Sequence, residues 1–194
     1  MDLYQQALNR LQEVLKEAKK ANLREPKAMT LATVDERGQP SVRTVFLEAV
    51  DERGFVFFTD HRSRKARQLA SNPRAALCCY WQPLRQQVQV EGGAELVPEE
   101  EADAYWVTRN RDGQFAAWAS QQSAPLDSLE ALKHRLNECR ERFSFEQVPR
   151  PPHWSGFRIV PERIEFWRYG WHQLHERVCY QQSKDGWTVL LLNP

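Results

Sequence analysis

The sequence has 194 residues, of which 41% are hydrophobic, and a formal net charge of +1 at pH 7. This length supports one sizeable hydrophobic core but not two comfortable domains, so we expect a single domain over residues 1–194. The near-zero net charge excludes a general electrostatic attraction to nucleic acid or to an anionic membrane, and neither is expected as a partner.

The amino-terminal residues include Lys16, Lys19 and Lys20 and lack the uninterrupted apolar stretch of a signal peptide. No later segment has the apolar length of a membrane span. We therefore expect a cytoplasmic protein. The cysteines show neither the CxxC spacing of a zinc or redox site nor the density of a secreted scaffold, and we expect them to be reduced: Cys78, Cys79, Cys139 and Cys179.

Apolar residues recur at helical spacing from Leu3 to Ala18, which predicts one amphipathic helix within residues 1–24. Short runs rich in Val, Thr, Phe and Leu follow, and these indicate strands. The sequence Asp-Glu-Arg-Gly occurs at 35–38 and again at 51–54, each time between two such runs, and predicts two tight hairpins. The predicted strands are Met29–Val34, Val42–Val50, Phe55–Thr59, Ala75–Trp81 and Gln87–Val97.

Residues 98–145 return to a helical period, and prolines at 149, 151 and 152 then form a stiff connection. Strands resume over residues 156–194 as Gly156–Val160, Arg163–Arg168, His175–Gln181 and Trp187–Leu192. Strands on both sides of a helical insert favour one sheet over two domains. The predicted fold is mainly β with flanking helices, an antiparallel barrel.

A candidate anion site lies where the predicted strand ends at Thr59 and Ser63 begins a helix as its N-cap. Arg64 and Lys65 occupy the first helical turn, where the helix dipole disfavours cations. Free backbone N–H groups, a hydroxyl and two cations are typical of a phosphate site. The alternative is that Arg64 and Lys65 are solvated surface residues.

Arg43 alternates with Val45 and Leu47 in its strand, so a cation shares a face with apolar side chains and should be paired. Gln87 is either a polar group that reads the edge of a heterocycle or an outward-facing strand glutamine.

Near the carboxyl terminus, Trp167, His175 and Arg177 bring together an indole, an imidazole and a guanidinium, which suit a planar anionic cofactor. His172 and His175 lie three residues apart in an expected strand, on opposite faces, so no metal site is predicted.

Several motifs occur in a fixed order along the chain: Ser63-Arg64-Lys65, Asn72-Pro73, Trp118-Ala119-Ser120, Trp154-Ser155-Gly156-Phe157-Arg158, Ile164-Glu165-Phe166-Trp167 and Leu174-His175-Glu176-Arg177. In these motifs the sequence resembles the pyridoxamine 5′-phosphate oxidase family from about Glu25 to Pro194. The resemblance implies an FMN-binding split β-barrel and a homodimer with FMN at the interface. It implies that FMN is held by Arg43, Thr44, Val45, Phe46, Leu47, Phe58, Thr59, Arg64, Lys65, Gln87, Gln122, Ser123, Trp167 and Arg177.

The positions that hold the substrate in the family are only half retained. By resemblance, Tyr105, Arg109 and His175 match the family's tyrosine, first arginine and histidine. The family's lysine, serine and second arginine are replaced by Glu48, Gly113 and Gln173. Each lost charge-assisted hydrogen bond is worth about 1.5–3 kcal/mol, and Glu48 adds repulsion toward a phosphate.

We interpret this pattern as an FMN-dependent oxidase in which a substrate carbon passes hydride to the flavin and O2 reoxidises it. Its small-molecule substrate is diverged, either cationic or non-phosphorylated, as in relatives that oxidise phenazine precursors, and His175 is the acid or base. A second hypothesis is a true pyridoxamine or pyridoxine 5′-phosphate oxidase that tolerates the changes. A third is a non-catalytic protein that binds flavin or pyridoxal phosphate.

Overall fold

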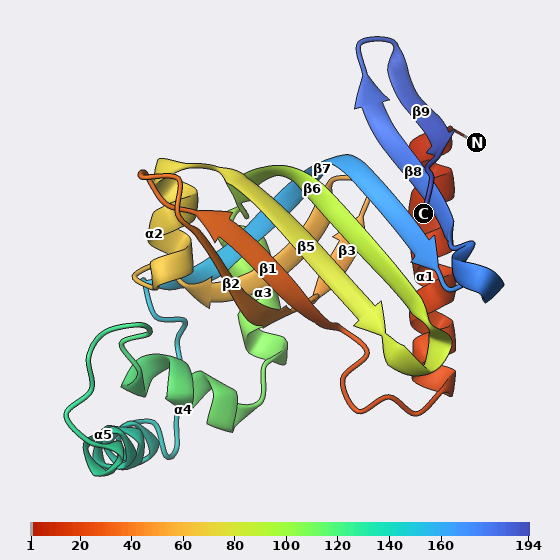
Figure 1. Ribbon diagram of the computed structural model, residues 1–194. Coiled ribbons are helices and arrows are strands. Elements are labelled where there is room, and N and C mark those ends of the chain that lie inside the picture. The colour runs from red at the N-terminus through yellow and green to blue at the C-terminus, as the bar shows by residue number, and fades with distance from the viewer. Residues whose placement is uncertain (1) are drawn as a thin grey trace.

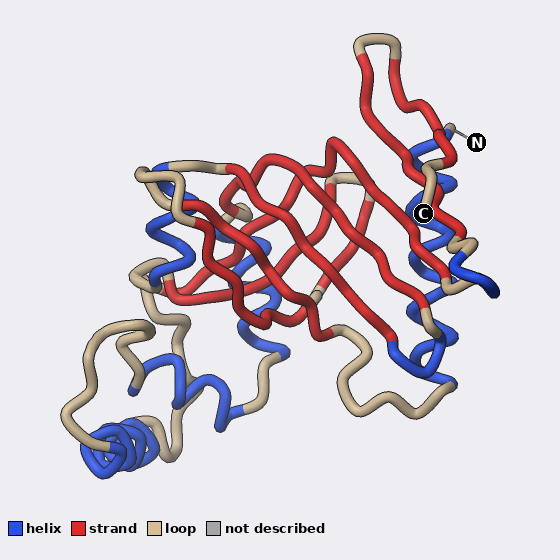
Figure 2. The backbone as a smooth tube through the Cα atoms, viewed as in Figure 1, coloured by secondary structure: helices blue, strands red, loops and turns tan. Residues whose placement is uncertain are grey.

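The computed structural model describes residues 2–194, and within them nine antiparallel strands form a single sheet that curls into a split barrel (Figures 1 and 2). The strand order is β2-β1-β5-β6-β7-β4-β3, with β8 paired to β7 and β9 to β8. The predicted mainly-β architecture with flanking helices is confirmed. The strands are β1 (Ala28–Val34), β2 (Pro40–Phe46), β3 (Ala49–Asp51), β4 (Gly54–Asp60), β5 (Arg74–Trp81), β6 (Gln86–Leu96), β7 (Trp154–Arg168), β8 (Glu176–Ser183) and β9 (Gly186–Leu191).

The predicted strand Val42–Val50 is wrong as one element, because β2 ends at Phe46 and β3 begins at Ala49. These two strands are the opposite edges of the main sheet, and only Leu47 and Glu48 join them. At this point hydrogen bonding changes sides: the Leu47 N–H donates to Lys27 O at 2.9 Å, and the Glu48 N–H donates to Val56 O at 2.9 Å. Joining the two edges through two residues requires the sheet to curl.

The two strands predicted on either side of Pro161 are instead one long strand, β7. The register with β6 shifts there, because Glu91 faces Arg163 whereas Gly92 faces Pro161, so Glu162 is the extra residue of a bulge. A Cβ at Gly92 would lie 2.0 Å from the Val160 carbonyl oxygen. Gly92 thus permits the close strand contact that keeps β7 continuous across its proline. The strand predicted from His175 also begins one residue later, at Glu176.

Helix α1 (Leu3–Lys20) lies along the end of the barrel beside β8 and β9 (Figure 1). Asp2 caps it by accepting from the Gln5 N–H at 2.7 Å. Its buried face joins the main core inside the barrel: Ala7, Leu8, Leu11, Val14 and Ala18. Among residues 2–194, no helix has both the length and the apolar character needed to cross a bilayer.

Helix α2 (Arg64–Ser71) covers the opposite end of the barrel, and the insert between β6 and β7 contains α3 (Glu99–Thr108), α4 (Arg111–Ala119) and α5 (Leu129–Arg142). Helices α4 and α5 lie to one side of the sheet, on a small aromatic core of their own (Figure 1). That core includes Trp106, Phe115, Phe143, Val148 and Trp154. Because Trp154 begins β7, this second core fixes the insert to the barrel near α2.

Candidate functional site

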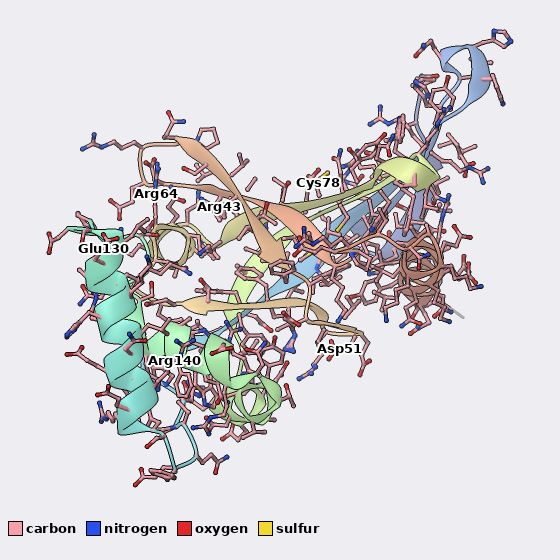
Figure 3. The ribbon with its side chains drawn as sticks, turned by 90° about the horizontal axis from the view of Figure 1, so that it is seen from below. Arg43, Asp51, Arg64, Cys78, Glu130 and Arg140 are labelled. Atoms are coloured by element: carbon pink, nitrogen blue, oxygen red, sulfur yellow. The ribbon has the colours of Figure 1, made fainter. Side chains whose placement is uncertain are left out.

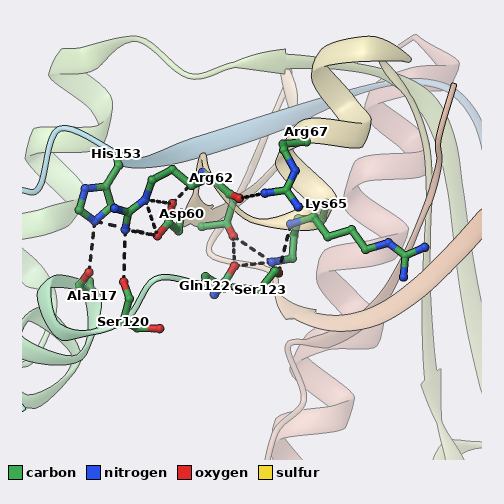
Figure 4. Close-up of polar contacts among 11 residues, drawn as sticks. Asp60, Arg62, Lys65, Arg67, Ala117, Ser120, Gln122, Ser123 and His153 are labelled. Carbon is green, nitrogen blue, oxygen red and sulfur yellow. Dashed lines mark hydrogen bonds and ion pairs between the residues drawn. The ribbon is translucent and has the colours of Figure 1, made fainter. Parts of the chain in front are cut away.

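The first group of expected site residues gathers at the amino-terminal end of α2. Lys65 Nζ donates to Thr59 Oγ1 at 3.0 Å and to Gln122 Oε1 at 2.6 Å, and Thr59 Oγ1 donates to Gln122 Oε1 at 2.8 Å (Figure 4). The Arg64 N–H donates to Ser123 Oγ at 3.1 Å. A strand end, a helix start and a loop more than fifty residues further on therefore meet at one point.

The N-cap expected at Ser63 is confirmed, since its hydroxyl accepts from the Ala66 N–H and its side chain is fully buried. Arg43 extends this group from β2 and lies on the same side of the barrel as Arg64 (Figure 3). Among the ion pairs of residues 2–194, none involves Arg43, Arg64 or Lys65. Three cations thus converge without a carboxylate partner.

The pKa values show the electrostatic strain of this arrangement. Burial, and then the charge of Arg43, lowers the pKa of Lys65 to about 8. Burial and the charge of Arg64 lower the pKa of Arg43. The nearby carboxylate of Asp60 is occupied by Arg62, which donates to it at 2.7 Å. An anion placed among the three cations would relieve their repulsion.

The other expected site residues in β2 and just after it lie on two different faces of the sheet. Val45 and Leu47 are 7% and 2% exposed and belong to the core, so toward a ligand they offer only main-chain atoms. Thr44 and Phe46 lie on the outer face, where Phe46 is 46% exposed. Arg43 was expected to be paired, and it is satisfied by neutral acceptors instead of a carboxylate.

A second group of expected residues forms a row across three neighbouring strands. Gln87 of β6 faces Trp167 of β7, which in turn faces Arg177 of β8. Residues opposite each other in antiparallel strands share one face of the sheet, so an amide, an indole and a guanidinium lie side by side. Arg177 is also held by Glu165, to which its Nε donates at 2.7 Å.

His175 and Gln173 lie in the loop between β7 and β8, next to this row. The Gly170 N–H donates to His175 Nδ1 at 3.2 Å, and His175 Nε2 lies 3.1 Å from Gln173 Oε1. A ring nitrogen that accepts carries no proton, so neutral His175 has its proton on Nε2 and donates it to Gln173. In this tautomer the imidazole is a hydrogen-bond donor at Nε2.

The structure does not bring the two groups together within one chain. Ser155, the partner of Thr59, and Trp167 stand near opposite ends of β7, so roughly 40 Å of strand length lies between them. Helix α2 and strand β8 accordingly lie at opposite ends of the barrel (Figure 1).

The residues expected at the substrate position form a third group, beside the first. The rings of Phe58 and Tyr105 stack with centroids 4.0 Å apart, and Phe58 also stacks on Trp154 at 5.2 Å. Burial, then the hydrogen bond and charge of Glu48, raises the pKa of Tyr105 to about 12, while Arg109 acts in the opposite direction. Glu48 and Arg109 therefore both lie close enough to Tyr105 to act on the pKa of its hydroxyl, in opposite directions.

Arg109 lies over Trp154, with its guanidinium carbon 5.3 Å from the ring centroid. A Cβ added at Gly113 would lie 2.9 Å from Arg109 Nε, so a serine there would displace this side chain. A cavity of about 210 Å³ lined by Arg109, Trp154 and Gln122 links this third group to the first.

The sequence reasoning missed Thr33 and Gln68, whose side chains accept hydrogen bonds from Arg43. Gln68 lies on the buried face of α2 between Ala66 and Leu69. A glutamine at a core position of an amphipathic helix is the signal that would have found it. Trp154 was missed as a site residue as well, because its partners come from distant segments.

The curled sheet defines a split-barrel protein, and the start of α2 is its candidate anion site. Residues 15–168 match the sequence family described as Pyridoxamine 5′-phosphate oxidase, and residues 154–194 match the family described as Pyridoxine 5′-phosphate oxidase C-terminal dimerisation region. The chain belongs to the pyridoxamine 5′-phosphate oxidase family.

Curated relatives have the name pyridoxine/pyridoxamine 5′-phosphate oxidase. The Alkalilimnicola ehrlichii protein is 51% identical over 100% of both chains, and the Myxococcus xanthus protein is 49% identical over 96% of this chain and 91% of its own. Among solved structures, PhzG from Burkholderia lata, in complex with tetrahydrophenazine-1-carboxylic acid, is 34% identical with a TM-score of 0.92 and covers 96% of this chain and 92% of its own. An FMN-binding protein from Nostoc punctiforme, 18% identical with a TM-score of 0.78 over 100% of this chain and 98% of its own, shares the fold.

Proposed function

We propose that this protein is an FMN-dependent oxidase of a reduced, non-phosphorylated heterocycle. The three cations at the start of α2 fit the phosphate of FMN, because within residues 2–194 none of Arg43, Arg64 and Lys65 forms an ion pair and Asp60, the carboxylate that acts on Lys65, is already held by Arg62. When bound, FMN supplies the acceptor for hydride, and O2 reoxidises it. The cavity beside Gln122 and Arg109 is where the substrate would lie against the cofactor.

The observation that carries the substrate class is the position of Glu48. Its carboxylate raises the pKa of Tyr105 against the opposing effect of Arg109, so it lies near the two residues that would face the phosphate of the family's usual substrate. A carboxylate repels a phosphate dianion and compensates the charge of Arg109. The pocket is therefore suited to an uncharged or cationic group, or to a single carboxylate bound by Arg109 alone. The bound heterocycle of the PhzG structure supports this class of substrate.

The roles of the chain's own groups follow from this placement. Tyr105 and Arg109 bind and orient the substrate, and Phe58 with Trp154 provides an apolar aromatic wall that excludes water. His175 Nε2, which the Gln173 side chain holds in place, would offer a hydrogen bond to a substrate atom.

The test is anaerobic mixing of the FMN-loaded protein with pyridoxamine 5′-phosphate, pyridoxamine and tetrahydrophenazine-1-carboxylic acid, followed by the visible absorbance of the flavin. We expect a non-phosphorylated compound to reduce the flavin faster than pyridoxamine 5′-phosphate. Rapid reduction by pyridoxamine 5′-phosphate, with efficient steady-state turnover, would overturn the proposed substrate class.

The second candidate function is pyridoxine/pyridoxamine 5′-phosphate oxidase itself. It is favoured by the name of relatives that are about half identical over nearly the whole chain. In that case Arg109, which lines the cavity, would bind the phosphate despite Glu48, whereas Arg111 donates to the backbone carbonyls of Glu146 and Phe143.

We further propose a homodimer in which each FMN contacts both chains. The row of Gln87, Trp167 and Arg177 lies at the opposite end of the barrel from Lys65, so a second copy is needed to bring both groups to one ligand. The match of residues 154–194 to a dimerisation region supports this arrangement.

This arrangement predicts complementation between two defective chains. Lys65→Met and Trp167→Ala should each weaken FMN binding at both sites of its own homodimer, so the test is run at an FMN concentration that fills only wild-type sites. Co-expressed with different tags and purified as a heterodimer, they should recover about one FMN per dimer, against two for the wild type, because one of the two sites has both wild-type halves. Flavin absorbance per protein measures the result. If the heterodimer binds no FMN, each site lies within one chain, because both sites would then carry a substitution.

A further inference from the structure

The guanidinium of Arg43 is enclosed by neutral hydrogen-bond acceptors. Arg43 Nη1 donates to Leu31 O at 3.1 Å and to Thr33 Oγ1 at 2.6 Å, and Nη2 donates to Gln68 Oε1 at 3.2 Å. We call these three acceptors the neutral cage. A half-buried guanidinium is commonly paired with a carboxylate, and this one is not.

The neutral cage is rigid because its members also bind each other. Thr33 Oγ1 donates to Gln68 Oε1 at 2.6 Å, which closes a ring with the two Arg43 contacts. Gln68 Nε2 donates to Ser41 Oγ at 3.2 Å, so its amide has one orientation, with the oxygen toward Arg43. Thr33 and Gln68 are 0% and 5% exposed, so neither side chain has solvent as an alternative partner.

The neutral cage orients Arg43 without neutralising it. A glutamate at position 68 has the same shape as glutamine and would form an ion pair with Arg43 in this geometry. The positive charge that repels Lys65 and Arg64 would then be compensated inside the protein. With glutamine, that charge is left for an external anion.

We propose that Gln68 is a positioning residue that, with Thr33, directs the uncompensated charge of Arg43 toward the phosphate of the cofactor. This inference rests on the proposed FMN site. It adds that Gln68 controls the affinity of the site for FMN through Arg43, without contacting the ligand itself. Because Gln68 lies on α2, it also ties the orientation of Arg43 to the helix whose first turn carries Arg64 and Lys65.

The test compares Gln68→Glu with Gln39→Glu, which makes the same change of charge at an exposed turn next to β2. We expect Gln68→Glu to weaken FMN binding about 10- to 100-fold, the loss of one charge-assisted contact, and to reduce its dependence on salt. Its binding of riboflavin, which lacks the phosphate, should be unchanged. Gln39→Glu should change FMN affinity less than about twofold. Equal FMN affinity in wild type and Gln68→Glu would overturn the inference.

Two further measurements separate this inference from the cofactor assignment. Inorganic phosphate should raise the thermal unfolding temperature of the cofactor-free wild type, and it should raise that of Gln68→Glu by a smaller amount, whether or not FMN binds. If wild type is stabilised by phosphate but does not bind FMN, the proposed cofactor is wrong while the neutral cage stands. If phosphate stabilises both proteins equally, the neutral cage is wrong. Gln68→Met keeps the site uncharged and should weaken FMN binding less than Gln68→Glu.

Discussion

Replacing Lys65 with methionine should weaken FMN binding roughly tenfold to more than a hundredfold, because it removes one charge-assisted hydrogen bond worth about 1.5–3 kcal/mol. Lys65 Nζ points at the junction of Thr59 and Gln122, and its charge has no carboxylate partner there. Methionine retains much of the apolar stem. The dissociation constant, measured by flavin fluorescence quenching, is the readout.

The same lysine makes the affinity depend on pH. Burial holds the pKa of Lys65 at about 8 in the free protein, and a bound phosphate favours the charged form and raises that pKa. Binding therefore takes up a proton, and wild-type affinity should fall as pH rises through about 8. The stability of the free protein depends on pH in the opposite direction. The unfolded lysine keeps its ordinary pKa of 10.5, so the contribution of Lys65 to stability rises from pH 8 toward 10.5.

The matched control is Lys133→Met, on the exposed helix α5, where the lysine is 73% exposed. It should leave both the FMN affinity and its pH dependence unchanged. If Lys65→Met retains wild-type affinity, or retains the fall in affinity above pH 8, the cations at the start of α2 are not the phosphate site.

Replacing Glu48 with lysine should raise kcat/KM for pyridoxamine 5′-phosphate roughly 100-fold or more, because repulsion is removed and a charge-assisted contact is gained. The new ammonium group would lie next to Tyr105 and Arg109, which then form a basic pocket. The gain should appear mainly in KM, since the change concerns binding of a group remote from the reacting carbon. Steady-state oxidase assays measure it.

Glu52→Lys is the control for this change, because it alters the charge equally at an exposed residue of the β3–β4 turn. It should leave kcat/KM for every substrate unchanged. Unaltered turnover of pyridoxamine 5′-phosphate by Glu48→Lys would show that Glu48 does not control substrate choice. A parallel loss of activity with the non-phosphorylated substrate would strengthen the assignment.

Most elements of the fold could be predicted from the sequence. The helix before Pro26, the two Asp-Glu-Arg-Gly hairpins and the Ser63 cap all depend on short-range chemistry, and the structure contains each of them. The errors lie where a strand changes partners. Leu47 and Glu48 look like strand residues, but they cross from one sheet edge to the other. Pro161 looks like a terminator, but a bulge and Gly92 carry β7 through it.

The candidate site was predictable only in its composition. Family motifs identified the residues, but not that Val45 and Leu47 are core side chains, nor that Gln68 and Thr33 orient Arg43. Their roles in binding stay predictions until the FMN and substrate experiments are done.

The sequence by itself determined the family, the order of the elements and the types of side chain available for a phosphate and an aromatic ligand. These follow from local periodicity, capping and motif spacing, which act over a few residues. Only the tertiary structure decided that Lys65 meets Gln122, that Trp167 and the partner of Thr59 lie near opposite ends of β7, and that Glu48 and Arg109 both act on Tyr105. Those contacts depend on how strongly the sheet curls and on where β7 bulges, properties of the paired strands together and not of any one segment.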